Sequence, residues 1–379
     1  MPPTSCDVAV VGGGIMGAAT AFWLRRHDPS LRVVVCEAET LAHGASGRNA
    51  GFLLLGTHTD YASAIGAHGR SRARQLWQFT QETVQLIRET LDGAAFDLAL
   101  TGSLIAAGSP EEAERLRRSA ELLAEDGAEA VYHDAGDVNR RIHAQGFHGA
   151  LFVPEGGTMH PVKLVRHLLA LSGATALEGA RVTAMEPVNR GMRLVSERGI
   201  VEAGMVVLTL GAYLPQLVPE AAQFVRPVRA QMLATAPVAP VLGLPVYSHG
   251  GFFYLRQHAD GRLLLGGARH LHEAEEVGYD DATTEALQAD LEAYLQTHLP
   301  EIGAPVIERR WSGTMGFSPD GLPVVGTVPG LERATFATGF TGHGMGFSLR
   351  FGLLLANRVF ERTDSYADLF DTRQVNAAT

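Results

Sequence analysis

The chain has 379 residues, of which 46% are hydrophobic and 19% are charged, and its formal net charge is −10. This composition is ordinary for a globular enzyme of roughly two or three domains, and the acidic balance argues against nucleic-acid binding. Two cysteines are too few for a disulfide framework, and no apolar run reaches the length of a membrane span. The first predicted strand begins near residue 7, which leaves no room for a signal peptide. We therefore expect a cytoplasmic protein, and peripheral contact with a membrane stays open.

The first predicted elements are a strand over 8–11, a glycine turn and an amphipathic helix over 18–26. The turn has the spacing G-x-G-x-x-G. Its first glycine allows a sharp exit from the strand, its second lets a pyrophosphate approach the backbone, and its third lets the helix pack closely. The N-terminus of the helix offers free N–H groups to phosphates. The candidate cofactor residues here are Gly12, Gly14, Ile15, Met16 and Gly17.

A second apolar strand is predicted over 31–36, and Glu37 follows it directly. Glu37 lies 20 residues past Gly17, the spacing expected of a carboxylate that binds a ribose 2′-hydroxyl. A carboxylate at this place would repel a 2′-phosphate. The pattern therefore favours FAD or NAD over NADP.

Further along the chain, apolar periodicity predicts a helix over 72–91. Ser109, Pro110 and Glu112 form the pattern of a capping box that starts a second helix, which should end at Gly127. A third helix follows Asp281 and ends at Pro300. Short strands are predicted over 182–185, 191–196, 205–210, 230–234, 251–256, 262–266 and 335–338.

The last predicted strand runs into a glycine-rich turn over 339–346, which opens a final helix through Phe360. Glycine turns that open helices therefore stand at both ends of the chain. If both build one site, a second domain interrupts the nucleotide-binding domain in sequence.

Four segments together resemble the FAD-dependent D-amino-acid oxidase superfamily, which includes glycine oxidase, sarcosine oxidase and related amine oxidoreductases. The first is the dinucleotide turn with Glu37. The others are residues 44–51, residues 154–161 with the strand from Val182, and residues 311–323 with the turn at 342–345.

This resemblance implies an α/β fold. A Rossmann-like FAD-binding domain of the glutathione-reductase type would be interleaved with an α+β substrate domain built on an antiparallel sheet. We expect residues 1–90, 146–222 and 312–379 in the FAD-binding domain, and residues 91–145 and 223–311 in the substrate-binding domain. The further cofactor residues that it implies are Ala45, Ser46, Arg48, Asn49, Ala50, Gly51, Val182, Gly211, Gly342, His343, Gly344 and Met345.

On the substrate side, many relatives hold a carboxylate with an arginine, because the guanidinium fork matches two oxygens. Met315 stands at that position here. Either another arginine serves, or the substrate has no carboxylate near the flavin. The candidate arginines are Arg48, Arg256 and Arg269. We expect Tyr254, Arg256, His343 and Met315 on the substrate side, with His58 either beneath the flavin or exposed.

Some relatives attach flavin through a cysteine or a histidine, and Gly313 and Arg48 stand at those places. We therefore expect noncovalent FAD. The only lysine, Lys163, follows His160-Pro161 on a predicted helix, where we expect a solvated charge. Lysine-assisted oxygen activation is not expected, and the electron acceptor is O₂ or a quinone.

The predicted reaction is oxidation of the C–N bond of an amino acid or amine to an imine, by hydride transfer to flavin N5. Two alternatives remain at this point. The chain could be the flavin-bearing subunit of a hetero-oligomeric amine or opine oxidoreductase, or an amine dehydrogenase with an acceptor other than oxygen. An NAD-dependent dehydrogenase fits the glycine segments less well. Metal catalysis is not expected, because His133, His143, His148 and His160 do not have the spacing of metal ligands.

Overall fold

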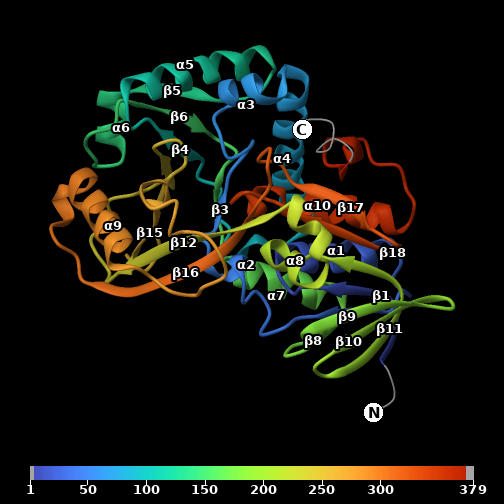
Figure 1. Ribbon diagram of the computed structural model, residues 1–379. Helices are drawn as coiled ribbons and strands as arrows, with labels where there is room; N and C mark the ends of the chain where they lie inside the picture. Colours follow the sequence, from blue (N-terminus) through green and yellow to red (C-terminus); the bar gives the residue numbers. More distant parts are fainter. Residues whose placement is uncertain (1–3, 373–379) are drawn as a thin grey trace.

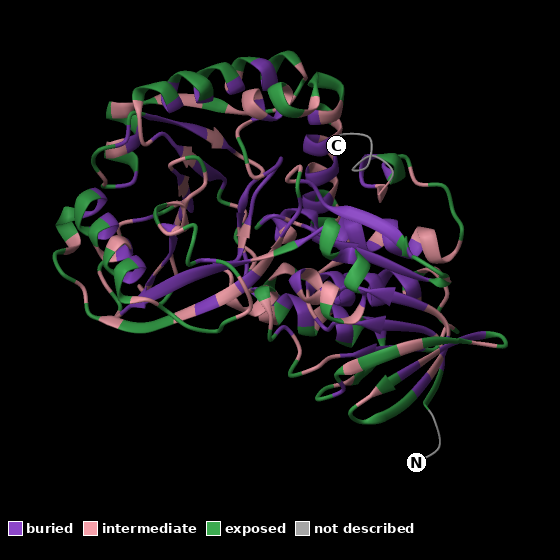
Figure 2. Ribbon diagram, in the orientation of Figure 1, coloured by how far each residue is buried: buried purple, intermediate pink, exposed green. Residues whose placement is uncertain are grey.

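The computed structural model describes residues 4–372. Within them, the strands form two eight-stranded sheets and one two-stranded ribbon (Figure 1). Buried residues gather along the two sheets, whereas many residues of β9 (Val182–Val188) and the end of β10 (Gly191–Ser196) are exposed (Figure 2). In this part of the chain, no helix is both long and apolar enough to cross a membrane.

The first sheet is built around β1 (Thr4–Val11), which pairs in parallel with β2 (Val33–Cys36) and β11 (Gly199–Leu208). Its other strands are β8 (Thr175–Leu177), β9 (Val182–Val188), β10 (Gly191–Ser196), β17 (Val324–Val328) and β18 (Leu331–Thr338). The strand order is β17-β18-β11-β1-β2-β8, with the β9–β10 hairpin attached to β11. Because the carboxyl ends of parallel strands meet at one edge, this sheet predicts a ligand site beyond β1.

Four long helices accompany this sheet: α1 (Ile15–His27), α4 (Arg70–Thr90), α7 (Pro161–Ser172) and α10 (Gly344–Val359). The predicted amphipathic character of the first helix is wrong, because every residue of α1 from Ile15 to Leu24 is buried. Helices α7 and α10 pack against α1, so no face of this stretch meets water. At the crossing with α10, Gly352 approaches Ala19 so closely that a Cβ would lie 2.6 Å from its carbonyl carbon.

The second sheet has the order β16-β12-β15-β14-β13-β4-β6-β5 and is antiparallel except between β13 and β4. Its strands are β4 (Ser103–Ala106), β5 (Val131–Asp134), β6 (Gly149–Val153), β12 (Arg226–Thr235), β13 (Val246–Ser248), β14 (Phe253–Gln257), β15 (Leu263–Gly267) and β16 (Ile307–Phe317). Its helices are α5 (Pro110–Glu125), α6 (Ala135–Arg141) and α9 (Glu285–His298).

Shorter elements connect the two layers. They are α2 (Ala45–Arg48), α3 (Tyr61–His68), α8 (Leu214–Leu217) and the ribbon of β3 (Phe52–Leu53) with β7 (Gly157–Thr158). Single turns of 3₁₀-helix occur at Gly93–Phe96, Gly211–Tyr213, Pro219–Gln223, Arg269–Leu271, Pro300–Ile302 and Ala367–Leu369.

The expected antiparallel sheet and Rossmann-like layer are both present, but strand pairing departs from the predicted boundaries at two places. β6 falls within 146–222 and yet pairs with β4 and β5 of the second sheet. Residues 312–317 of β16 also pair with β12 in that sheet. Strand pairing depends on distant partners, which local composition does not reveal.

The helix over Pro110–Glu125 begins as predicted, with the Ser109 side chain accepting a hydrogen bond from the Glu112 N–H (3.2 Å). The second half of the predicted capping box is wrong. The Glu112 carboxylate accepts from the N–H groups of Gly108 (2.7 Å) and Gly250 (2.6 Å) instead of reaching back to Ser109. The Gly250 N–H, on the turn between β13 and β14, binds the Glu112 carboxylate in place of the Ser109 N–H that a capping box uses.

Candidate active site

The turn after β1 is closed by backbone atoms on both sides. A Cβ at Gly12 would lie 2.7 Å from the Thr209 carbonyl oxygen, and one at Gly17 would overlap the Gly12 carbonyl. The Thr209 hydroxyl donates to the carbonyl oxygens of Val11 and Gly12, each at 3.1 Å. Sequence reasoning missed Thr209, because nothing in its local pattern shows that β11 ends beside this turn.

Glu37 lies at the end of β2, as its spacing predicts. Its carboxylate accepts hydrogen bonds from the N–H groups of Gly13 (2.7 Å) and Glu39 (3.0 Å). The Ala180 N–H donates to the Glu37 carbonyl (2.7 Å), which brings the β8–β9 connection, and hence Val182 at the start of β9, to the same edge.

The early loop, residues 44–51, lies directly on the dinucleotide turn. The Ser46 hydroxyl accepts a hydrogen bond from the N–H of Ile15 (2.9 Å), and a Cβ at Gly14 would lie 2.9 Å from the same oxygen. Asn49 holds the loop in shape: its amide donates to the carbonyls of Ala45 and Ser46 and its oxygen accepts from Gly51. The early loop and the dinucleotide turn, which lie apart in sequence, therefore form one candidate cofactor-binding surface, called the cradle below.

The C-terminal turn, residues 339–346, reaches the same place from the other end of the chain. α10 starts at Gly344, where a Cβ would lie 4.0 Å from the Met16 side chain at the start of α1. Neither helix has an acidic residue in its first turn. Two helix N-termini thus converge with their partial positive charges uncompensated.

The other predicted cofactor residues lie around this cradle. Gly211 follows β11 with φ of 54°, and its carbonyl accepts from the Thr338 hydroxyl (2.8 Å). Ala50 and Met345 are buried. In the dinucleotide turn, a Cβ at Gly12, Gly14 or Gly17 would lie within 3 Å of a neighbouring atom, and the N-terminus of α1 follows directly, so the residues present fit an FAD.

One face of the second sheet covers this region. Tyr254 of β14 pairs with Tyr247 on one side and with Gly266 on the other, so all three stand on the same face. A Cβ at Gly266 would overlap Met232 and the Tyr254 ring. On β16, Met315 lies 3.6 Å from the position of a Cβ at Gly342. Met315 therefore lies next to the C-terminal turn, and Tyr254 stands on the same face of the sheet as Tyr247; their role on the substrate side stays a prediction.

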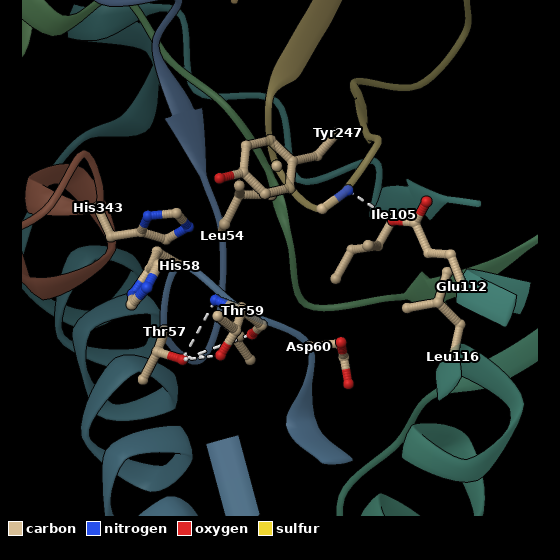
Figure 3. A pocket seen from close by; sticks show the side chains of 13 residues that line it. Leu54, Thr57, His58, Thr59, Asp60, Ile105, Glu112, Leu116, Tyr247 and His343 are labelled. Carbon is tan, nitrogen blue, oxygen red and sulfur yellow. Dashed lines mark hydrogen bonds between the residues drawn. The ribbon is translucent and has the colours of Figure 1, made fainter. Parts of the chain in front are cut away.

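A cavity opens between this face and the early part of the chain (Figure 3). His343 lies at one end of it, beside His58, and Glu112 and Asp60 lie at the other. The Tyr247 and His343 rings meet edge to face, with centroids 5.6 Å apart. Other residues that line the cavity are Leu54, Leu55, Thr57, Thr59, Ile105, Leu116, Gly250 and Gly251.

Burial determines the ionisation of His343, which lines the cavity, and of Tyr254, which stands on the same sheet face as the cavity residue Tyr247. Desolvation lowers the pKa of His343 to about 4, so its imidazole is neutral at pH 7, and burial raises the pKa of Tyr254 to about 12. His58 is half-buried, not exposed, and its Nδ1 has no hydrogen-bond partner within residues 4–372. His343, at the end of the cavity next to the C-terminal turn, is thus uncharged, whereas the carboxylates of Asp60 and Glu112 lie at the other end.

The three candidate arginines are in different situations. Arg48 is committed to structure, because its guanidinium pairs with Asp281 (2.5 Å) and donates to the Ser312 carbonyl (2.9 Å). Arg256 is buried and donates to the Met159 carbonyl (3.1 Å). Neither Arg256 nor Arg269 lines the cavity. Arg269 makes no side-chain hydrogen bond or ion pair with any residue that the structure describes.

Arg269 lies between two aromatic rings. Its guanidinium carbon is 5.0 Å from the centroid of Phe252 and 4.6 Å from that of Phe317. Tyr247 and Tyr254 are close enough to interact electrostatically with its charge. Stacking fixes the plane of the guanidinium and leaves its N–H edge available.

Lys163 lies on α7 and is half-exposed. Its ammonium pairs with Asp97 at 2.8 Å. Lys163 therefore takes part in a surface ion pair and is partly solvated.

Within residues 4–372, no group of three or more histidine, cysteine or acidic side chains could hold a metal ion.

Comparison with known proteins agrees with this geometry. The family model for FAD-dependent oxidoreductases, the D-amino-acid oxidase group, matches residues 7–358. The chain belongs to this family. It is therefore an FAD-dependent oxidoreductase, which confirms the family and the cofactor expected from the sequence.

Two curated relatives illustrate the range of the family. The chain is 27% identical over 384 residues to the gamma-glutamylputrescine oxidoreductase of Escherichia coli K12, an alignment that covers 96% of this chain and 87% of that protein. It is 28% identical over 379 residues to the glycine oxidase of Geobacillus kaustophilus, with 96% and 95% covered.

Solved structures share the fold over the full length. The glycine oxidase of Geobacillus kaustophilus superimposes with a TM-score of 0.80 at 25% identity, covering 98% of this chain and 99% of that one. The L-proline dehydrogenase of P. horikoshii gives a TM-score of 0.83 at 21% identity, with 99% of each chain covered. This confirms the predicted fold class.

Proposed function

We propose that the chain oxidises the C–N bond of an amine that also carries a carboxylate, and that Arg269 binds this carboxylate. The observation that carries the proposal is the free guanidinium of Arg269, stacked between Phe252 and Phe317 next to Tyr247 and Tyr254. It supplies the cation that Met315 cannot supply. Glycine oxidase among the relatives acts on a substrate of this class.

Bound FAD supplies a two-electron acceptor for a hydride from the carbon next to the amine. The chain's own residues hold the substrate for this step. Arg269 fixes the carboxylate, Tyr254 offers a hydroxyl to the amine or carboxylate, and neutral His343 can accept a hydrogen bond from the amine N–H. Burial beside Tyr254 and His343 favours the uncharged amine, which is the form that releases a hydride.

We further propose that the FAD is held without a covalent bond. The early loop and β16 meet where Arg48 faces Gly313, with the Arg48 Cβ 3.1 Å from the position of a Gly313 Cβ, and neither residue can form a flavin bond. Cys6 and Cys36 are buried in β1 and β2. Acid precipitation should therefore leave a colourless pellet, and a yellow pellet would contradict this.

A second candidate function concerns the electron acceptor. Because Lys163 is paired with Asp97 on the outside of α7, it cannot supply a cation at the flavin. A dehydrogenase that reduces a quinone, alone or as the flavin subunit of a larger complex, is the alternative to an oxidase. The rate of flavin reoxidation with O₂ against that with a quinone, together with the size of the active species, separates these cases.

The main test compares substrates with and without a carboxylate. Amino acids, N-methyl amino acids and the matching decarboxylated amines are mixed anaerobically with the holoenzyme, and flavin bleaching is followed. Arg269→Met should raise KM for the best carboxylate-bearing substrate by about 10- to 100-fold, the range expected for a lost charge-assisted hydrogen-bond pair. KM for the decarboxylated amine should not change.

The matched control is Arg262→Met, which removes a partly exposed guanidinium just before β15 that pairs with Asp260 and Glu308. It should leave both KM values unchanged. If Arg269→Met affects the two substrates equally, Arg269 is not the carboxylate site.

A further inference from the structure

Arg256 is a buried cation without an anion. Its side chain belongs to β14 and is only 8% exposed. One terminal N–H donates to the Met159 carbonyl (3.1 Å) and, at 3.5 Å, approaches the Gly51 carbonyl. Its Nε is buried with no partner, and no carboxylate lies within ion-pair distance among residues 4–372.

The charged groups around Arg256 do not neutralise it. Asp97 is the acidic neighbour that favours its charge, but this carboxylate is partly exposed and already binds the Lys163 ammonium. The other titratable neighbours are His160 and His258, which can add only positive charge. Desolvation lowers the pKa of Arg256 from its usual value, but a guanidinium stays protonated at any ordinary pH.

A buried charge is unfavourable unless an opposite charge or several hydrogen bonds compensate it. Here the compensation within the protein is two carbonyls. Gly51, one of the two, ends the early loop, whose Ser46 touches the dinucleotide turn. The anion that would compensate Arg256 therefore belongs on the cofactor side of this loop.

We propose that Arg256 is the counter-charge of the reduced flavin and raises the reduction potential of the bound FAD. Reduction by two electrons and one proton, delivered as a hydride from the substrate, leaves one negative charge on the ring, whereas the oxidised ring is neutral. A fixed cation in a dry site stabilises the charged form over the neutral one. The proposal rests on the FAD-dependent reaction above and adds a residue to it that does not contact the substrate.

The test measures the midpoint potential of the bound FAD, by dye equilibration during slow enzymatic reduction of the holoenzyme. Arg256→Met removes the charge and Arg256→Lys keeps it. Arg256→Gln removes the charge but can still donate to the Met159 carbonyl. In both neutral variants, the affinity for reduced FAD should fall about tenfold more than the affinity for oxidised FAD. This change corresponds to a midpoint potential about 30 mV more negative. Arg256→Lys should stay near the wild-type potential.

The stability of the apoprotein distinguishes a role of the Arg256 charge in flavin reduction from a role in holding the fold. If the charge is uncompensated without cofactor, Arg256→Met should not lower the melting temperature of the apoprotein. Arg262→Met, which removes an ion-paired arginine directly before the neighbouring strand β15, is the control and should leave the potential unchanged.

Unchanged potentials in the Met and Gln variants would overturn the proposal, as would a potential in the Lys variant as low as in the Met variant. If Arg256→Met fails to fold, the Gln and Lys variants decide by the same criterion. A wild-type chain that binds no FAD would overturn the proposed function as well, whereas a flavin of unchanged potential overturns only the role of Arg256.

Discussion

Gly17 and the carbonyl oxygen of Gly12 approach so closely that a single added carbon has no space. The atoms in conflict are backbone atoms of the turn itself, which cannot move without opening the groove above α1. Gly44 is the opposite case. It stands at the start of the early loop with φ of −71°, and nothing lies within 4 Å of an added Cβ.

This contrast gives a prediction for two alanine substitutions. Gly17→Ala should lower the free energy of unfolding by about 1–3 kcal/mol, the cost of overpacking, and abolish copurification of FAD. Gly44→Ala should change the free energy of unfolding and the amount of copurified FAD only slightly. Urea denaturation and the flavin-to-protein absorbance ratio check this, and FAD retained at full occupancy in Gly17→Ala would contradict it.

At the same scale, sequence reasoning located the glycines well and the arginines poorly. A glycine in this motif is required by the local path of the backbone, so spacing alone identifies Gly12, Gly14 and Gly17. The difference between Arg256 and Arg269 depends on partners from the early loop and from Phe317. Those partners become neighbours only when the second sheet forms, so nothing near either arginine in sequence distinguishes them.

Helix α5 and the β13–β14 turn are joined by one side chain, that of Glu112 (Figure 3). The turn has positive φ at three successive residues, His249, Gly250 and Gly251. A Cβ at Gly251 would overlap the Tyr247 hydroxyl, so the position of this turn sets the position of the ring in the cavity. Glu112 therefore acts on the substrate side through Tyr247.

We predict that Glu112→Gln lowers the free energy of unfolding by about 1 kcal/mol, because one of two partly buried N–H groups loses its acceptor. It should also raise KM several-fold. Ser109→Ala removes a cap at the start of the same helix and should cost about 1 kcal/mol with KM unchanged. Urea titration and steady-state kinetics measure both quantities, and an equal rise in KM for the two variants would refute a positioning role.

At the level of elements, helices were easier to predict than their contacts. The apolar stripe over 72–91 and the cap at Ser109 identified α4 and α5 within one or two residues. The burial of α1 on all sides was not predicted, because its last turn carries Arg25, Arg26 and His27, which look like a solvated face. Only the packing of α7 and α10 shows that the rest of the helix is enclosed.

The whole molecule contains buried histidines that stay neutral when folded. Burial lowers the pKa of His249 from 6.5 to about 4, and His270 and His298, which face it, are lowered for the same reason. When the folded-state pKa is below the unfolded one, the unfolded chain takes up protons first as the pH falls. The stability due to His249 is complete above about pH 6.5 and is lost between about pH 6.5 and pH 4, and His270 and His298 act in the same direction.

We therefore predict a lower melting temperature at pH 5 than at pH 7.5. His249→Asn removes one of these groups, and asparagine tolerates the left-handed backbone at this position, where φ is 55°. The difference in melting temperature between the two pH values should be smaller in the variant. Scanning calorimetry of both proteins checks this, and an unchanged difference would exclude His249 as a contributor.

The order of domains along the chain could be predicted only in outline. Glycine turns at both ends raised the hypothesis that the two ends of the chain build one site, and the structure brings Gly344 next to Met16. The limits of the inserted part could not be found from composition. β6 and the end of β16 look like any short apolar strand, and only their partners assign them to the second sheet.

Lys163 has a practical consequence beyond its ion pair with Asp97. Because it is the only lysine of the chain and its side chain is 50% exposed, an amine-reactive fluorophore has one side-chain target. That target lies on α7, which packs against α1 of the dinucleotide turn. A dye whose emission overlaps flavin absorption would lose intensity when FAD binds, so one labelling reaction converts the chain into an optical sensor of its own cofactor occupancy.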